Sequence, residues 1–333
     1  MNKSKAISLT GPVVFIIFYS FLGWGHRIPP VDDCTPIREE IFRIPPTGGT
    51  VEIPSGTYLC RTPIVLDRNH LRLVGQGKVI IRLDKNANAP VIVMGDIQTP
   101  PRPLRNIQVL NLEIDGNRWH QKYECWGGPC DQGGTTFIRN NGITVRGITN
   151  GFIQDVIVKS NRSGGIVTER GCFDLDIDNL VSQDNEFDGF AGYETFGTRL
   201  TRLNLSNNHA AGISLDIRFH GNLFRDVKIE NNNDVGVFMR DSNFNTFENI
   251  TLSNNGSHGI FLAKADNDST CTIDNEFQNL SVSRSRGYGF LLNDSCEGNR
   301  LLGKVEFLEN RDGCLYEPIP GQVAIEGKML CID

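Results

Sequence analysis

The fold is decided by residues 212–240, which read GISLDIRFHGNLFRDVKIENNNDVGVFMR. A Gly is followed by a short run of alternating apolar and polar residues (213–216), and a second such run follows at 224–229. At residue 236 another Gly starts the pattern again. Alternation with a period of two is typical of β-strands that have one buried face. The stretch therefore predicts a repeat of two short strands separated by turns.

The same unit recurs through the second half of the chain. It starts at glycines that are 23 or 24 residues apart, with one step of 30: Gly142, Gly165, Gly189, Gly212, Gly236, Gly259 and Gly289. Asparagines recur on either side of the second strand: Asn222, Asn245, Asn275 and Asn299 before it, and Asn185, Asn208, Asn232 and Asn255 after it. Asn tolerates left-handed backbone and bonds to neighbouring turns, so stacked copies are expected at the corners of a solenoid.

Two solenoids fit a repeat of this length. Residues 200–208 (LTRLNLSNN) also match the leucine-rich pattern L-x-x-L-x-L-x-x-N. A leucine-rich repeat returns through a helix or an extended turn, whereas these units contain a second alternating strand and little helical periodicity. We therefore predict an all-β chain folded as a single-stranded right-handed parallel β-helix with coils of about 23–25 residues, and keep the leucine-rich horseshoe as the alternative.

The N-terminal part extends this interpretation. Residues 48–58 (GGTVEIPSGTY) and 71–77 (LRLVGQG) resemble the first coils of the pectin-lyase-like superfamily of right-handed β-helices, and the likeness covers roughly residues 44–315. The superfamily includes lyases, hydrolases, epimerases and non-catalytic adhesins, so the resemblance does not select a reaction. The resemblance also implies that Ca²⁺ can assist catalysis on uronates. The chain has neither a D-x-[DN]-x-[DN]-G loop nor a C-x-x-C pair, so no metal ligand is assigned, and Ca²⁺ bound by scattered carboxylates stays open.

The amino-acid composition excludes some classes of protein and partner. The chain has 333 residues, a net charge of −6, 39% hydrophobic residues and no block of Lys or Arg, which argues against disorder and against a nucleic-acid partner. We expect a monomer with one β-helix domain over 29–333. Its expected parts are N-terminal coils at about 44–105, an inserted loop at about 117–140, repeated coils at about 141–315 and a C-terminal cap at about 316–333.

The N-terminus and the cysteines indicate export. Lys3 and Lys5 precede an apolar run at 13–22, which predicts a signal peptide within residues 1–28; an uncleaved N-terminal anchor is the alternative. We expect a secreted, extracellular or periplasmic protein without other contact with a membrane. Cysteine spacing suggests the disulfides Cys34–Cys60, Cys125–Cys130, Cys271–Cys296 and Cys314–Cys331, and it leaves Cys172 as a buried thiol.

Superposing the coils gives a candidate site. Residues directly after the repeat glycines are apolar and should point inward, so the fourth position should point outward. Reading that position along the solenoid gives Arg146, Glu169, Tyr193, Asp216 and Arg240. Coils are about 4.8 Å apart, so the column spans about 19 Å, enough for several sugar units. Arg218 and His220 flank it. The alternative is an ordinary solvated ladder of charges, worth about 0.2–1 kcal/mol per pair.

The inserted loop offers aromatic residues for the same face. Trp119, Tyr123 and Trp126 lie in it, just before the strand that carries Arg146. Exposed aromatic rings can stack on sugars, and long loops in compact solenoids often carry function. The alternative is that these rings only cap an apolar coil edge.

Residue types in the column favour an acidic polysaccharide as substrate. Removing the proton beside a uronate carboxylate needs a cation, here Arg240, Arg218 or Arg146, and a base, here Tyr193 or His220. Departure of the leaving group then gives a lyase, and reprotonation from the other face gives a C5-epimerase. Tyr193 can be a base only where Arg charge stabilises its phenolate.

Two alternatives stay open. Glu169 and Asp216, about 9.6 Å apart by strand spacing, could serve an inverting glycoside hydrolase, which needs about 6.5–9.5 Å. A non-catalytic glycan-binding protein could use the same face.

Overall fold

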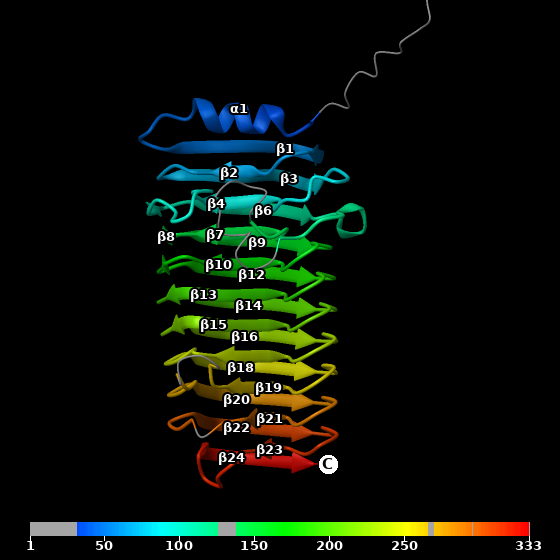
Figure 1. Cartoon of the computed structure of the whole chain (residues 1–333), viewed down its shortest axis with the longest axis vertical. Coiled ribbons are helices and arrows are strands. Elements are labelled where there is room, and N and C mark those ends of the chain that lie inside the picture. Colours follow the sequence, from blue (N-terminus) through cyan, green and yellow to red (C-terminus); the bar gives the residue numbers. More distant parts are fainter. Residues whose placement is uncertain (1–31, 126–137, 266–269, 295, 333) are drawn as a thin grey trace, which may run out of the picture. The chain divides into compact units, whose positions relative to one another are not determined.

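The computed structural model describes residues 32–125, 138–265, 270–294 and 296–332. Two long parallel sheets wind around one apolar core (Figure 1). The predicted parallel β-helix is confirmed. A helix, α1 (Thr35–Arg43), packs on the first coil through Ile37 and Ile41, and a short 3₁₀ turn, η1 (Arg118–His120), precedes the inserted loop.

Sheet A has one strand from each coil. In spatial order its strands are β1 (Gly49–Cys60), β3 (Leu71–Leu83), β6 (Gln108–Asp115), β9 (Phe152–Lys159), β12 (Asp176–Gln183), β14 (Arg199–Ser206), β16 (Leu223–Glu230), β18 (Thr246–Ser253), β20 (Glu276–Ser283), β22 (Arg300–Leu308) and β24 (Ala324–Ile332).

Sheet B carries the strands that follow the repeat glycines. Its main path is β2 (Ile64–Leu66), β4 (Ile92–Gly95), β7 (Ile143–Arg146), β10 (Ile166–Glu169), β13 (Phe190–Phe196), β15 (Ile213–His220), β17 (Val237–Arg240), β19 (Ile260–Ala263), β21 (Phe290–Leu292) and β23 (Leu315–Tyr316). Three short strands extend its edge: β5 (Leu104–Arg105), β8 (Ile148–Thr149) and β11 (Cys172–Phe173).

Period-two alternation fills the core as predicted. Ile213 pairs in register with Val237, and Val237 with Ile260; all three are fully buried. From sheet A, the ring of Phe247 stacks between those of Phe224 and Phe277, with centroids 4.7 and 4.8 Å away. Stacked identical side chains thus turn each coil into a template for the next.

The recurring asparagines form two buried ladders at the corners. Asn245 Oδ1, for example, accepts from the backbone N–H (3.0 Å) and the side-chain amide (3.1 Å) of Asn222 on the preceding coil. Asn232 Oδ1 does the same for Asn208, at 3.0 and 2.9 Å. Each Asn satisfies turn N–H groups that would otherwise be buried without a partner, which explains its recurrence.

Three predicted disulfides are confirmed: Cys34–Cys60, Cys271–Cys296 and Cys314–Cys331. Cys125 is disulfide-bonded, but the predicted partner Cys130 lies outside the described residues, as does the predicted leader. Cys172 is a buried free thiol, and burial raises its pKa to about 11. No helix in the described part of the chain is long and apolar enough to cross a membrane.

Candidate active site

Sheet B places the predicted column on neighbouring strands. Arg146 pairs with Glu169, and Tyr193 pairs with Asp216. Arg240 reaches Asp216 from the next coil, its Nε lying 3.1 Å from both carboxylate oxygens. The expected register of the coils is therefore present in this sheet.

The expectation that Arg146 is open to solvent is wrong. Its side chain is 2% exposed and lies 2.8 Å from Glu169. The guanidinium also donates to the carbonyl oxygen of Ile97 (3.3 Å) and to Thr99 Oγ1 (3.0 Å). Residues between β4 and β5 thus cover it, so Arg146 orients Glu169 from below the surface.

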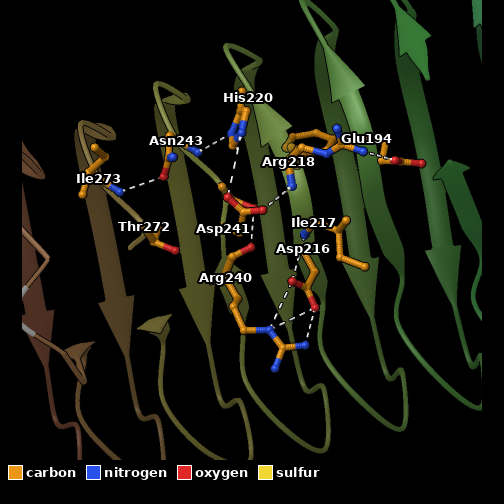
Figure 2. A network of polar contacts seen from close by, with 12 residues as sticks. Glu194, Asp216, Ile217, Arg218, His220, Arg240, Asp241, Asn243, Thr272 and Ile273 are labelled. Carbon is orange, nitrogen blue, oxygen red and sulfur yellow. Dashed lines mark hydrogen bonds and ion pairs between the residues drawn. The ribbon is translucent and has the colours of Figure 1, made fainter. Parts of the chain in front are cut away.

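Ion pairing changes what the other arginines can do. Arg240 is bound to Asp216, and Arg218 is bound to Glu194 (Figure 2). A substrate carboxylate would have to compete with carboxylates of the protein for both guanidinium groups. The ladder alternative is therefore correct in part, because these pairs neutralise one another.

A β-bulge interrupts β15 beside this column. Register shifts between Tyr193 and Thr195 of β13, so that both Ile217 and Arg218 lie opposite Glu194. Ile217 has φ 49° and Arg218 has φ 60°, and Ile217 is 50% exposed. A β-branched residue in left-handed backbone is strained, and bulges of this kind re-aim side chains near functional sites.

A cavity of about 390 Å³ opens beside the bulge; we call it the Tyr193 cavity. Val167 and Ala191 line the cavity. They occupy the second position after the repeat glycines, where side chains also point outward from sheet B but are shorter than those of the column. The other residues that line it are Arg139, Asn141, Ser163, Gly164, Glu169, Arg170, Phe187, Asp188, Tyr193, Glu194 and Ile217.

Asp188 is the unusual carboxyl group of this cavity. Burial raises its pKa to about 6, and the charge of Asp234 adds to that rise. The N–H of Ala211, which donates to Asp188 Oδ1 at 3.0 Å, and the nearby Arg139 oppose the shift without cancelling it. Asp188 can therefore gain or lose a proton near neutral pH, as catalytic acids and bases do.

Tyr193 is held as a neutral phenol. Burial raises its pKa well above the usual range, and the charges of Asp188, Asp216 and Glu169 add to the effect. The charge of Arg139 opposes this rise without cancelling it, and Arg240 and Arg146 are ion-paired with Asp216 and Glu169. Tyr193 is therefore protonated at neutral pH, whereas the base role expected from the sequence requires the phenolate.

Arg139 brings a cation to the same cavity. Its guanidinium lies 4.5 Å from the centre of the Phe187 ring, and its Nε lies 3.8 Å from Glu124. Glu124 accepts from the backbone N–H of Asn140 at 3.2 Å, and burial raises its pKa to about 7. Two contacts thus fix Arg139, which the sequence reasoning missed.

The remaining predicted residues lie outside this cavity. His220 Nδ1 accepts from the N–H of Asn243 at 3.0 Å (Figure 2), and burial lowers the pKa of His220. Trp119 and Tyr123 are 75% and 53% exposed, but neither is among the described residues that line the cavity. Trp126 lies outside the described residues.

The described residues offer Ca²⁺ no carboxylate cluster. They contain no group of three or more His, Cys, Asp or Glu placed to hold a metal ion. Glu169 and Asp216, the carboxylates of the column, are each bound by an arginine.

Fold and site together define a parallel β-helix with a polar cavity on the outer face of one sheet. The chain belongs to the right-handed beta helix region family, whose model matches residues 141–310. No curated protein matches the chain.

Solved structures share the architecture. The mannuronan C-5 epimerase AlgE6 A-module of Azotobacter vinelandii is 14% identical with a TM-score of 0.55, over 85% of this chain and 91% of that chain. ORF18 of Geobacillus virus E2 is 18% identical with a TM-score of 0.64, over 91% and 59%. A tailspike protein of E. coli bacteriophage HK620 is 14% identical with a TM-score of 0.62, over 91% and 61%. At these identities the likeness concerns the fold.

Proposed function

We propose that this chain is a secreted polysaccharide lyase or C5-epimerase that binds an acidic polysaccharide along sheet B and reacts in the Tyr193 cavity. The observation that carries the proposal is the meeting of three groups in one cavity: the Asp188 carboxyl with a pKa of about 6, the neutral phenol of Tyr193 and the guanidinium of Arg139. A base, an acid and a cation are the parts that uronate chemistry needs.

The roles follow from these environments. Arg139 pairs with the uronate carboxylate, which makes the adjacent C5–H more acidic. Asp188 takes that proton as a carboxylate, and the electron pair passes into the neutralised carboxyl group. The phenol of Tyr193 then donates its proton to the leaving glycosidic oxygen, which gives an unsaturated end and a shorter chain, or to the opposite face of C5, which gives the epimer.

The predicted column keeps supporting roles. Glu169, held by the buried Arg146, lines the cavity, and Glu194, paired with Arg218, lies at the bulge. Asp216, Arg240 and His220 lie on the next coils, where a bound polymer would pass.

Two features outside the cavity support the proposal. The disulfides fit an exported protein. The periplasmic alginate epimerase AlgG shares the fold at 15% identity with a TM-score of 0.53, and the HK620 tailspike has been solved in complex with a hexasaccharide. This fold therefore accommodates both uronate epimerisation and binding of a long oligosaccharide.

A glycoside hydrolase is the second candidate, favoured by a different feature of the same cavity. Asp188 and Glu169 both line it; burial raises the pKa of Asp188 to about 6, and Glu169 is ion-paired with Arg146. That pair could supply a general acid and an ionised partner. Asp216, the partner of Glu169 expected from the sequence, is bound to Arg240 and is not among the described residues that line the cavity.

The test is a panel of polygalacturonate, alginate and glycosaminoglycan substrates in heavy water. A lyase produces an ultraviolet-absorbing end; an epimerase inverts C5 and incorporates deuterium there without shortening the chain. Asp188→Asn should abolish either product, whereas Asp226→Asn, on the exposed surface of sheet A, should not. Reducing ends without absorbance would select the hydrolase instead. Binding without any product would refute catalysis.

A further inference from the structure

A second cavity, of about 300 Å³, lies on the same face toward the C-terminal coils; we call it the Phe261 cavity. Asp188 lines both cavities, so the two adjoin. Phe238 of β17 and Phe261 of β19 line the Phe261 cavity. Both occupy the second position after a repeat glycine, and they pair directly in register. The proposed reaction uses none of the aromatic residues here.

The aromatic wall is rigid. Phe238 and Phe261 meet edge to face with centroids 5.5 Å apart, and the ring of His258 packs on Phe261 at 5.7 Å. The lining of the cavity also includes small side chains, among them Ala210 and Ser214. Flat apolar rings that face a narrow polar hollow suit the C–H face of a sugar ring, which is apolar on one side and carries hydroxyl groups at its edge.

His258 offers a hydrogen-bond donor of fixed orientation. Its Nδ1 accepts from the backbone N–H of Tyr288 at 3.0 Å, so the proton of the neutral ring is on Nε2. Burial lowers the pKa of His258, which favours that neutral form. Gly287 packs so closely that a Cβ there would lie 2.4 Å from Nδ1. Nε2 has no hydrogen-bond partner among the described residues and can donate to a sugar hydroxyl.

Charge separates the two cavities. Arg139 and Arg170 line the Tyr193 cavity together with Glu169, Asp188 and Glu194, whereas the described lining of the Phe261 cavity contains Asp188 and Asp234 and no Lys or Arg. The guanidinium of Arg240, 5.9 Å from the centre of the Phe238 ring, is ion-paired with Asp216. A uronate placed in the Phe261 cavity would bring a third carboxylate next to two others in a partly desolvated space. A sugar without a carboxylate meets no such repulsion.

We infer that the Phe261 cavity binds a neutral sugar unit, so that the substrate is a heteropolysaccharide in which a neutral sugar adjoins the uronate that reacts. This inference rests on the proposed function for the uronate position. The aromatic wall and the donor of His258 recognise the neutral unit, and the two carboxylates reject a charged one.

The test is binding of the full-length protein to an array of defined oligosaccharides. The array carries homouronates from alginate and polygalacturonate, alternating uronate–neutral oligosaccharides from several polymers, and neutral glucans and xylans. Alternating oligosaccharides should be retained at least tenfold better than homouronates of equal length. Phe261→Ala and His258→Ala should each weaken that retention at least tenfold, whereas Phe42→Ala, on exposed α1, should not.

A charge reversal keeps the test decisive if an aromatic variant folds poorly. Asp234 is an exposed turn residue, so Asp234→Lys should fold, and it should raise the retention of homouronates severalfold. Glu52→Lys, exposed on sheet A, is the matched control. Equal or better wild-type binding of homouronates, absence of binding by every alternating and neutral oligosaccharide, or indifference of binding to both Phe261→Ala and Asp234→Lys would each overturn the inference.

The two proposals fail differently. If homouronates are converted and alternating chains are neither bound nor converted, the reaction stands and the neutral-sugar cavity falls. If alternating chains bind through Phe261 and His258 but no substrate is converted, the cavity stands and the enzyme falls.

Discussion

Replacing Asp188 by Asn should abolish activity and stabilise the folded protein at neutral pH. Burial holds the pKa of Asp188 at about 6 against an ordinary value of 3.8, which the unfolded chain retains. A carboxyl whose pKa is raised by folding stabilises the fold below about pH 4, and that contribution is lost as pH rises through about 6. At pH 8 the native protein therefore keeps a charge in a poorly solvated place, and Asn removes it.

The magnitude follows from the shift. About 2 pKa units at about 1.36 kcal/mol each give an upper value of about 3 kcal/mol, and the partial exposure of Asp188 reduces the expected gain to about 1–3 kcal/mol. The amide oxygen of Asn can still accept from the N–H of Ala211, which now donates at 3.0 Å. The gain should be present at pH 8 and largely lost at pH 4, where Asp188 is neutral in the folded protein and close to its own pKa in the unfolded chain.

Urea denaturation of the wild type and of Asp188→Asn at both pH values measures this difference. A variant that is less stable than the wild type at pH 8, or equally shifted at pH 4 and pH 8, would refute the reasoning. The pH profile of the wild type gives a second sign. A base at Asp188 loses activity as pH falls below about 6, whereas a hydrolytic acid at Asp188 loses it as pH rises above about 6.

Three further outcomes are expected. Tyr193→Phe should lower kcat about 10²–10⁴-fold by removing the proton donor, with polysaccharide binding changed only a few-fold; unchanged turnover would remove Tyr193 from the mechanism. Asn232→Leu should lower the stability by about 2–6 kcal/mol in urea, because two buried donors of Asn208 lose their acceptor, while the exposed Asn233→Ser should have little effect. Ile217→Asn should raise the stability by about 1 kcal/mol, since Asn tolerates left-handed backbone; a lower melting temperature would contradict this.

The coils were predictable because their determinants are local and repeated. Alternation fixes which side chains face the core, and the asparagine positions mark the corners. Three cysteine pairs follow from the spacing of the cysteines along the chain. For the same reason the register that brings Glu169 beside Arg146 could be read from the glycines.

The chemistry of the site depends on contacts that the repeat does not encode. Arg146 is buried because residues 97–99 fold over it. No pattern in the coil of Arg146 predicts this burial. The bulge in β15 appears in the sequence only as a step of 24 rather than 23 residues, which does not locate Ile217 as the extra residue.

Asp188 and His258 could have been found from the sequence, at a repeat position that the outward column does not include. Both directly precede a repeat glycine, at a position occupied by Asn141, Gly164, Asp188, Ala211, Val235, His258 and Tyr288 in successive coils. Asp188 and His258 thus put an ionisable group at a corner where Gly164, Ala211 and Val235 are small. Superposing that second column would have selected both cavities, although the pKa of Asp188 also depends on its burial and on Asp234, which raise it, and on Arg139, which lowers it.

In a solenoid, different positions of the repeat determine the backbone and the chemistry of the outer face. The backbone is set by stacked positions such as the asparagines, which cannot change without exposing or orphaning buried groups. Residues on the outer face can change coil by coil while their spacing stays at about 4.8 Å. Asp188 and His258 are three coils apart, so about 14 Å separates their corners along the axis. A polymer bound along the axis therefore contacts Arg139 at one coil and the aromatic wall of Phe261 at a coil nearer the C-terminus. The order of the coils fixes the order of these contacts.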